Sequence, residues 1–142
     1  MAQWSLNQAV FLDGRPIGWQ LLRADDYAAR REVVTGSWLR PDNRGDGIGT
    51  EMRTAVLHLA FHHLEARYAT SRATLDNRAS LGVSKRLGYE EDGMDVASAG
   101  EEALVLRRVR LSADRWRASD PGRSVTVDNY EQCREVFGLA GP

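Results

Sequence analysis

The stretch SWLRPDNRGDGIGT, residues 37–50, places closely spaced glycines between two predicted elements. Before it, REVVTGSWL (31–39) is rich in β-branched and aromatic residues and is followed by Pro41, which predicts a strand near 31–39. After it, apolar residues recur at largely helical spacing up to Glu65, which predicts an amphipathic helix. The glycine loop therefore joins the end of a strand to the start of a helix.

Further elements extend outward from this loop. Upstream, two apolar runs flank Asp13-Gly14, a strong hairpin signal that predicts strands near 8–12 and 15–22. Downstream, YATSRATL (68–75) predicts a strand, and Asp76 or Asn77 can cap a second helix through about Leu87, which Gly88 ends. The middle of the chain thus has the order strand, helix, strand, helix.

The C-terminal part predicts smaller elements. GEEALVLRRVRL (100–111) predicts a strand, followed by a short helix at 112–118, a strand at 124–127 and a helix at 129–137. Residues 119–123 (SDPGR) mark a break, so we expect a domain over 1–118 and a C-terminal extension over 119–142.

Composition limits the function classes. The chain of 142 residues fits one domain, and 19 basic against 20 acidic residues give no overall attraction to nucleic acid or to an anionic membrane. The single cysteine, Cys133, excludes an intramolecular disulfide and is expected to be half-buried. With no run of 18 apolar residues, we expect a cytoplasmic protein whose anion site, if present, is local.

The loop from Arg44 to Thr50 could be such an anion site. The first N–H groups of a helix have no partners and lie at its positive end, and glycine lets a phosphate approach the backbone. The loop lacks the Gly-Lys-Ser/Thr of a Walker loop, and a hairpin strand precedes it, which argues against a dinucleotide fold. Taken alone, it could also be a plain tight connection.

Two motifs in register resemble the GNAT superfamily of N-acyltransferases. Arg44-x-x-Gly47-x-Gly49 is similar to the Q/R-x-x-G-x-G/A loop that binds the pyrophosphate of acyl-CoA, and NRASLGVSKRLGY (77–89) resembles the N-x-x-S segment of the RimJ/RimL-like branch. The likeness covers about 8–111 and looks closest to actinobacterial members that use succinyl-CoA. It implies an α+β fold with a mixed, mainly antiparallel twisted sheet and helices on both faces.

The resemblance also implies a site. Pantetheine would pair with the exposed strand edge at Ser37, Trp38 and Leu39, and the Asn77 side chain would bond to it. Ser80 is the catalytic candidate, as a proton donor or hydrogen-bond partner of the CoA thiolate, although its hydroxyl could instead stabilise the helix. The pyrophosphate would lie on the amides of Arg44, Gly45, Asp46, Gly47, Ile48, Gly49 and Thr50.

The expected reaction is direct transfer of an acetyl or succinyl group from acyl-CoA to an amine, without a metal. The amine could be a protein N-terminus, a lysine or a small molecule. The general base is not assigned among Glu32, Glu101 and Glu102, and Tyr89 is expected in the core. A succinyl carboxylate could be bound by Arg72, Arg23 or Arg31. The 3′-phosphate of CoA could be bound by Lys85 or Arg86, although these two side chains could equally be solvated.

The sequence also contains possible features of a metal site and of a nucleic-acid-binding surface. His58 and His62 have a metal-compatible spacing but no third ligand, and the tryptophans Trp4, Trp19, Trp38 and Trp116 are expected in the core rather than on a base-stacking platform. The rival functions are a non-catalytic acyl-CoA-binding or regulatory module and a protein that binds another nucleotide in the same loop.

A homodimer is also expected. The family usually begins with a strand and two helices, whereas roughly seven residues precede the first matching strand here. Either the sequence starts late and the 1–118 domain is N-terminally truncated, or a second copy or the C-terminal extension covers the surface left behind. In either case we expect acyl-CoA binding with poor acceptor activity unless an upstream segment is restored. The residues suited to such a contact, which could equally pack on their own domain, are RSVTV (123–127), Tyr130, Val136, Phe137 and Leu139.

Overall fold

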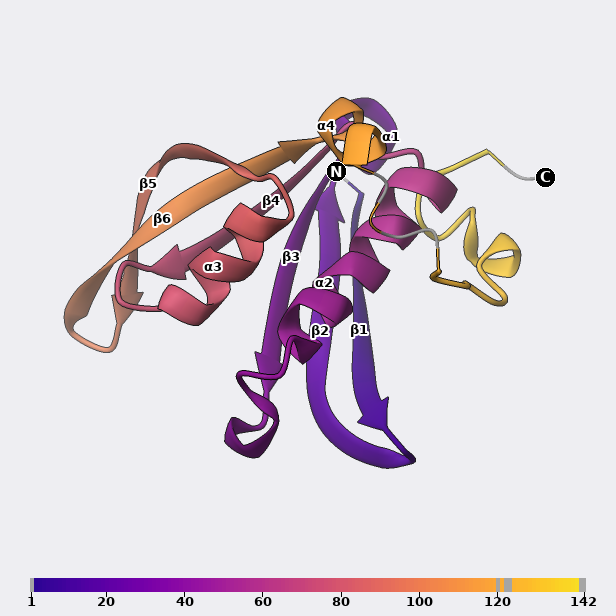
Figure 1. Cartoon of the computed structure of the whole chain (residues 1–142). Coiled ribbons are helices and arrows are strands. Elements are labelled where there is room, and N and C mark those ends of the chain that lie inside the picture. The colour runs from indigo at the N-terminus through magenta and orange to yellow at the C-terminus, as the bar shows by residue number, and fades with distance from the viewer. Residues whose placement is uncertain (1, 120, 122–123, 141–142) are drawn as a thin grey trace.

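The computed structural model describes residues 2–119, 121 and 124–140. Six strands form one mixed sheet in the order β1-β2-β3-β4-β6-β5, in which only the β3–β4 pair is parallel (Figure 1). This mainly antiparallel α+β arrangement confirms the predicted fold class. The strands are β1 (Gln3–Leu12), β2 (Arg15–Asp25), β3 (Glu32–Leu39), β4 (Tyr68–Thr74), β5 (Glu90–Ala99) and β6 (Glu102–Ser112).

The β1–β2 hairpin turns at the predicted Asp13-Gly14. Both residues have positive φ, 51° and 79°, which is the conformation that favours Asp and Gly at a two-residue turn. Both strands run further than expected, because β1 already begins at Gln3, which pairs with Asp25. A single helical turn, α1 (Tyr27–Arg30), then leads into β3.

The two main helices begin directly after their N-cap residues, Gly47 and Asn77. α2 (Ile48–His58) follows Gly47, whose φ is 82°, and continues as the π-helical turn η2 (Leu59–His63). α3 (Arg78–Arg86) is capped by Asn77, and Gly88, with φ of 92°, follows its end. α4 (Ala113–Ser119) matches the short helix predicted after the last strand.

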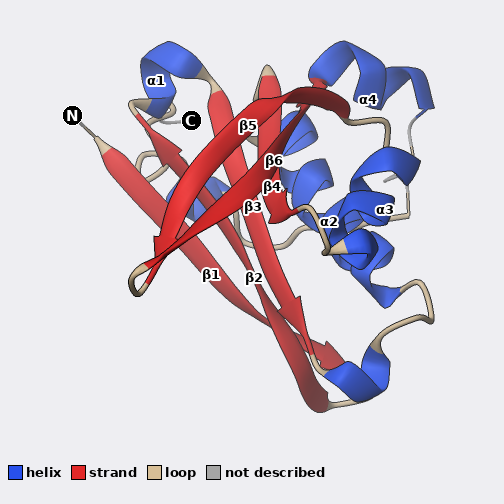
Figure 2. Ribbon diagram, turned by 90° about the vertical axis from the view of Figure 1, so that its left-hand side faces the viewer, coloured by secondary structure: helices blue, strands red, loops and turns tan. Residues whose placement is uncertain are grey.

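α2, α3 and α4 lie against the same face of the sheet (Figure 2). Alternate strand residues on this face are buried in one hydrophobic cluster with side chains from all three helices, including the fully buried Trp116. No described helix covers the opposite face, which we call the open face. In this respect the structure differs from the expected helices on both faces, and the open face carries paired charges instead.

The C-terminal segment corrects two predictions. Residues 124–127 form no strand, and 129–137 form only a 3-10 turn, η3 (Glu131–Cys133), followed by further turns. Phe137 and Leu139 are nevertheless buried in the same core, where Trp4 Nε1 donates to the Phe137 carbonyl at 3.0 Å. The segment therefore packs on its own domain, and Cys133 is exposed rather than half-buried.

Strand β5 was not foreseen. It carries charged residues and Gly93, and it forms the edge of the sheet by pairing with β6. Among the described residues, no helix is both long and apolar enough to cross a membrane.

Candidate functional site

The parallel strands β3 and β4 separate after three residue pairs. Glu32 pairs with Tyr68, Val33 with Ala69 and Val34 with Thr70, after which the ladder ends. β3 continues to Leu39 through pairing with β2 alone. The β3 edge from 36 to 39 that faces β4 therefore has no described strand beside it, which agrees with the exposed strand edge expected at Ser37, Trp38 and Leu39.

This unpaired edge contains the residues expected to hold pantetheine. Ser37 pairs with Gln20 and Trp38 with Trp19 in the β2–β3 ladder, and neither has a described strand partner on the β4 side. The Trp19 and Trp38 side chains lie on the open face and are 46% and 45% exposed, which corrects their expected place in the core. They border an open hollow of about 470 Å³ together with Pro16, Ile17, Gly18, Arg40, Pro41 and Asp42.

The glycine loop follows this edge directly. A 3-10 turn, η1 (Pro41–Asn43), leads into Gly45 and Gly47, whose φ values are 91° and 82°. A Cβ added at either glycine would meet no other atom within 4 Å, so the space above the backbone is open. The Arg44 side chain folds back, and its Nε donates to the Leu39 carbonyl at 2.8 Å.

The open loop ends at free backbone donors. The first intrahelical bond of α2 runs from the Glu51 N–H to the Gly47 carbonyl at 3.1 Å. The N–H groups of Ile48, Gly49 and Thr50 make no hydrogen bond to a described residue. Three donors at the positive end of a helix, beside two glycines that leave room, fit a diphosphate.

The start of α3 carries the second motif. The Asn77 side-chain oxygen accepts a hydrogen bond from the Ser80 N–H at 3.2 Å, and the amide nitrogen of this exposed residue makes no hydrogen bond to a described residue. The Ser80 hydroxyl makes no hydrogen bond to a described residue. A Cβ on Gly49 would lie 3.7 Å from Val83 Cγ2, so α3 packs against the first turn of α2. Folding thus brings the two sequence motifs together.

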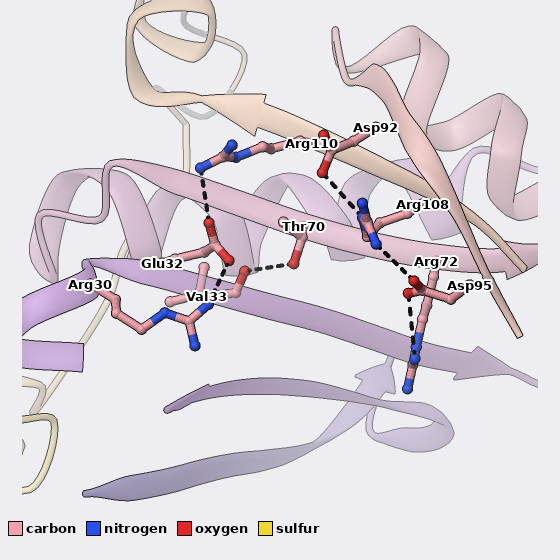
Figure 3. A network of polar contacts seen from close by, with 9 residues as sticks. All are labelled: Arg30, Glu32, Val33, Thr70, Arg72, Asp92, Asp95, Arg108 and Arg110. Carbon is pink, nitrogen blue, oxygen red and sulfur yellow. Dashed lines mark hydrogen bonds and ion pairs between the residues drawn. The ribbon is translucent and has the colours of Figure 1, made fainter. Parts of the chain in front are cut away.

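Figure 3 shows a network of ion pairs on the open face. Arg108 of β6 bonds to Asp92 at 3.2 Å and to Asp95 at 2.7 Å, and Arg72 of β4 lies 3.7 Å from the other Asp95 oxygen. The hydrogen bond with Asp92 and the charge of Asp95 raise the pKa of Arg108 above its ordinary value. This network was not predicted from the sequence, although Arg108 and Arg110 are two residues apart on a predicted strand, a spacing that indicates a charged face.

A comparison with known families identifies the chain. Residues 2–90, more than half of its length, match the family described as acetyltransferase (GNAT) domain. The chain belongs to this family.

Solved structures share the fold of this GNAT domain. A probable acetyltransferase superposes with a TM-score of 0.72 at 23% identity, covering 79% of this chain and 64% of its own. Mycobacterium smegmatis RimJ, in complex with CoA-disulfide, gives 0.71 at 21%, with 82% and 60% covered. Spermidine N-acetyltransferase from Vibrio cholerae, in complex with CoA and spermine, gives 0.71 at 15%, with 80% and 68% covered. The GNAT domain thus spans less than two thirds of the first of these chains.

The candidate bases of the GNAT domain lie away from the split. Glu32 precedes it and is held by Arg30 at 3.2 Å and by Arg110 at 3.0 Å. Glu101 and Glu102 are exposed at the end of the β5–β6 hairpin. Tyr89, as expected, is buried in the core.

His58 and His62 of the GNAT domain stack on one another where α2 continues into η2. The His58 and His62 rings are 4.6 Å apart, and His62 Nε2 accepts a hydrogen bond from the indole N–H of Trp116 at 3.1 Å. The described residues contain no group of three or more His, Cys, Asp or Glu side chains that could hold a metal ion.

Proposed function

We propose that this GNAT domain transfers an acyl group from acyl-CoA to an amine by direct attack. The observation that carries the proposal is the continuity of three features along the chain. The unpaired edge of β3 runs into an open glycine loop, and the loop ends at free N–H groups of α2. An extended pantetheine arm and a diphosphate require these two surfaces in this order.

Each predicted residue takes a role in this proposal. The backbone of Ser37, Trp38 and Leu39 pairs with the pantetheine arm as a neighbouring strand would. The amides of the loop from Arg44 to Thr50 bind the diphosphate, and the amide nitrogen of the exposed Asn77 donates to the pantetheine arm. The placement of Ser80 three residues after Asn77 supports its role near the thiol end of CoA.

The chemistry requires few side chains. The neutral amine attacks the thioester carbon, a C–N bond forms, the C–S bond breaks, and the amine loses a proton while the thiolate accepts one. Free thiols ionise near a pKa of about 8.5, so a hydrogen bond from a hydroxyl stabilises the departing sulfur. The Ser80 hydroxyl is the group we propose for that bond, because its hydrogen has no described partner.

The acyl group that we propose is acetyl or succinyl. Arg72 lies on β4 just beyond its last pair with β3, and its side chain is 47% exposed. Its carboxylate partner, Asp95, makes the shorter bond to Arg108. Arg72 therefore has charge available for a carboxylate at the acyl end, which succinyl-CoA carries and acetyl-CoA lacks.

We also propose that the protein forms a homodimer. Phe137 and Leu139 are buried in the core of their own chain, so a dimer contact would use other surfaces. The unpaired edges of β1 and β5 are the surfaces available for strand addition. Light scattering across a concentration series tests this point, and a monomer at every concentration would contradict it.

The proposed activity is tested first by ligand binding and then by turnover. Acetyl-CoA, succinyl-CoA and CoA should raise the melting temperature, whereas ATP should not. Thiol release should then appear with acyl-CoA and a panel of amines: a peptide N-terminus, a lysine side chain and a polyamine. Binding without turnover for every amine would favour the non-catalytic acyl-CoA-binding module. Stabilisation by ATP alone would contradict both.

A further inference from the structure

Arg53 is a buried arginine on α2. The residue is 5% exposed, and no described carboxylate forms an ion pair with it. Its Nη1 donates to Ser84 Oγ at 3.1 Å, and its guanidinium carbon lies 5.5 Å from the centre of the Tyr89 ring. A buried charge without a carboxylate partner is an unfavourable element of a core, so stability alone does not explain this residue.

The Arg53–Ser84 hydrogen bond lies next to a second contact between α2 and α3. Gly49 and Arg53 are four residues apart on α2 and therefore share one face of the helix. A Cβ on Gly49 would lie at ordinary contact distance, 3.7 Å, from Val83 Cγ2 of α3, and one turn later Arg53 reaches the neighbouring Ser84. The two helices are therefore in contact at Gly49, and the Arg53–Ser84 hydrogen bond adds a directional contact one turn further along both.

These contacts connect the two halves of the proposed site. Gly49 belongs to the loop whose amides would bind the diphosphate. Ser84 lies one helical turn after Ser80 on the same face of α3. Any shift of α3 along α2 would therefore move Ser80 and its cap Asn77 relative to the glycine loop.

We propose that Arg53 is a positioning residue that holds α3 in register with the glycine loop, so that one CoA molecule can contact both helices. The inference rests on the proposed acyl-CoA function. It assigns Arg53 no contact with the ligand, because the residue is buried. A ligand that contacts α2 alone should not depend on Arg53, whereas a ligand that bridges α2 and α3 should.

Two probes separate these cases. CoA spans both helices, and 5′-ADP offers only the diphosphate and nucleoside part that the loop would bind. Replacing Arg53 with Met keeps a long apolar side chain and removes the Ser84 bond, and Ser84→Ala removes the same bond from the other side. For R53M we expect CoA affinity to fall about tenfold, as for loss of one charged hydrogen bond, and ADP affinity to stay within about twofold.

The double variant tests whether the two residues act as one unit. If they do, R53M combined with S84A should bind CoA no more than about twofold more weakly than R53M alone. The matched control is Arg30→Met, which removes an exposed arginine and its ion pair with Glu32 from the open face. R30M should bind CoA and ADP as the wild type does. Melting temperatures measured without ligand monitor folding.

The outcomes are distinct. R53M that binds CoA within about twofold of wild type overturns the inference, and so does an equal loss of CoA and ADP affinity. If R53M does not fold, S84A decides: a loss of CoA affinity of about threefold with unchanged ADP binding supports the inference, and unchanged binding of both overturns it. A wild-type protein that binds no CoA would instead show that the proposed function, and with it this inference, is wrong.

Discussion

Val34 and Thr70 form the last pair between β3 and β4. The two strands are hydrogen-bonded to each other before this pair and separate after it. Before it, the two strands pair in parallel as part of the sheet. After it, β3 follows β2 as far as Leu39, while β4 follows β6, so a wedge opens between them. A peptide-like ligand arm entering this wedge would find the β3 edge without a neighbouring strand, where the Leu39 carbonyl accepts a hydrogen bond from the exposed Arg44 side chain.

Gly47→Val tests the glycine loop. The open space at Gly47 would be occupied by the new side chain, so CoA affinity should fall about tenfold or more, measured by calorimetry. A valine at φ of 82° also strains the backbone by roughly 1–2 kcal/mol. Gly14→Val is the matched control, because Gly14 has φ of 79° and an equally open Cβ position in the β1–β2 turn. Equal CoA binding by both variants would contradict the diphosphate site.

Ser80→Ala tests the hydroxyl proposed to assist the leaving thiolate. We expect kcat to fall about tenfold while the Kd for CoA stays within about threefold, because the contact forms in the transition state. Steady-state kinetics with the best amine, and CoA titration of the same preparation, measure both. Ser98→Ala, an exposed change on β5, should leave kcat unchanged. Undiminished turnover in S80A would limit Ser80 to a structural role.

Asn77 has two separable roles. Asn77→Ala removes the cap of α3 and should lower stability by about 1 kcal/mol, whereas Asn77→Ser retains a capping oxygen and should lower it far less. Neither variant keeps the amide donor, so both should lose CoA affinity to a similar degree. Chemical denaturation and CoA titration measure the two effects. If N77S binds CoA as well as wild type, the proposed bond to pantetheine does not exist.

The buried hydroxyl of Tyr27 should make the protein less stable at alkaline pH. Burial raises the pKa of Tyr27 to about 12, and its hydroxyl donates to the Leu64 carbonyl at 2.8 Å. An unfolded chain ionises its tyrosines near pH 10, so the folded state alone keeps this proton between pH 10 and 12. The contribution of this group to the free energy of unfolding should therefore be fully present below pH 10. The free energy of unfolding should fall by roughly 2 kcal/mol as the pH rises to 12.

The matched variant for this prediction is Tyr27→Phe, which has no proton to lose. It should be less stable at neutral pH by about 1–2 kcal/mol, because the Leu64 carbonyl loses its donor. Between pH 10 and 12 its stability should decline less than that of wild type. Denaturant unfolding at a series of pH values gives both curves, and parallel curves would show that the ionisation of Tyr27 is not linked to folding.

Local signals in the sequence were enough for several elements. Asp13-Gly14 specified a turn because both residues tolerate positive φ, and Asp76-Asn77 specified a helix start because either side chain can cap a helix, the structure placing Asn77 at the cap. The glycine loop was located for the same reason. In each case the partners lie within a few residues, so the pattern contains all of the interaction.

Strand β5 and residues 124–127 show where local patterns fail. β5 is held by pairing with β6 along the sheet edge, although its own sequence has little of the apolar alternation typical of strands. Residues 124–127 contain three consecutive β-branched residues but have no described strand beside them. A strand exists only where another strand offers free backbone groups, and sequence pattern does not report that availability.

From the sequence alone came the hairpin, both capped helices, the glycine loop and the family resemblance, because each depends on neighbouring residues or on a short motif. Only the tertiary structure decided where β3 and β4 part, that Glu32 meets Arg110, that Trp4 meets Phe137, and that Arg53 reaches Ser84. These contacts join residues from 31 to 133 positions apart. They form because the packing of several elements brings those residues together, and no single stretch of chain encodes that packing.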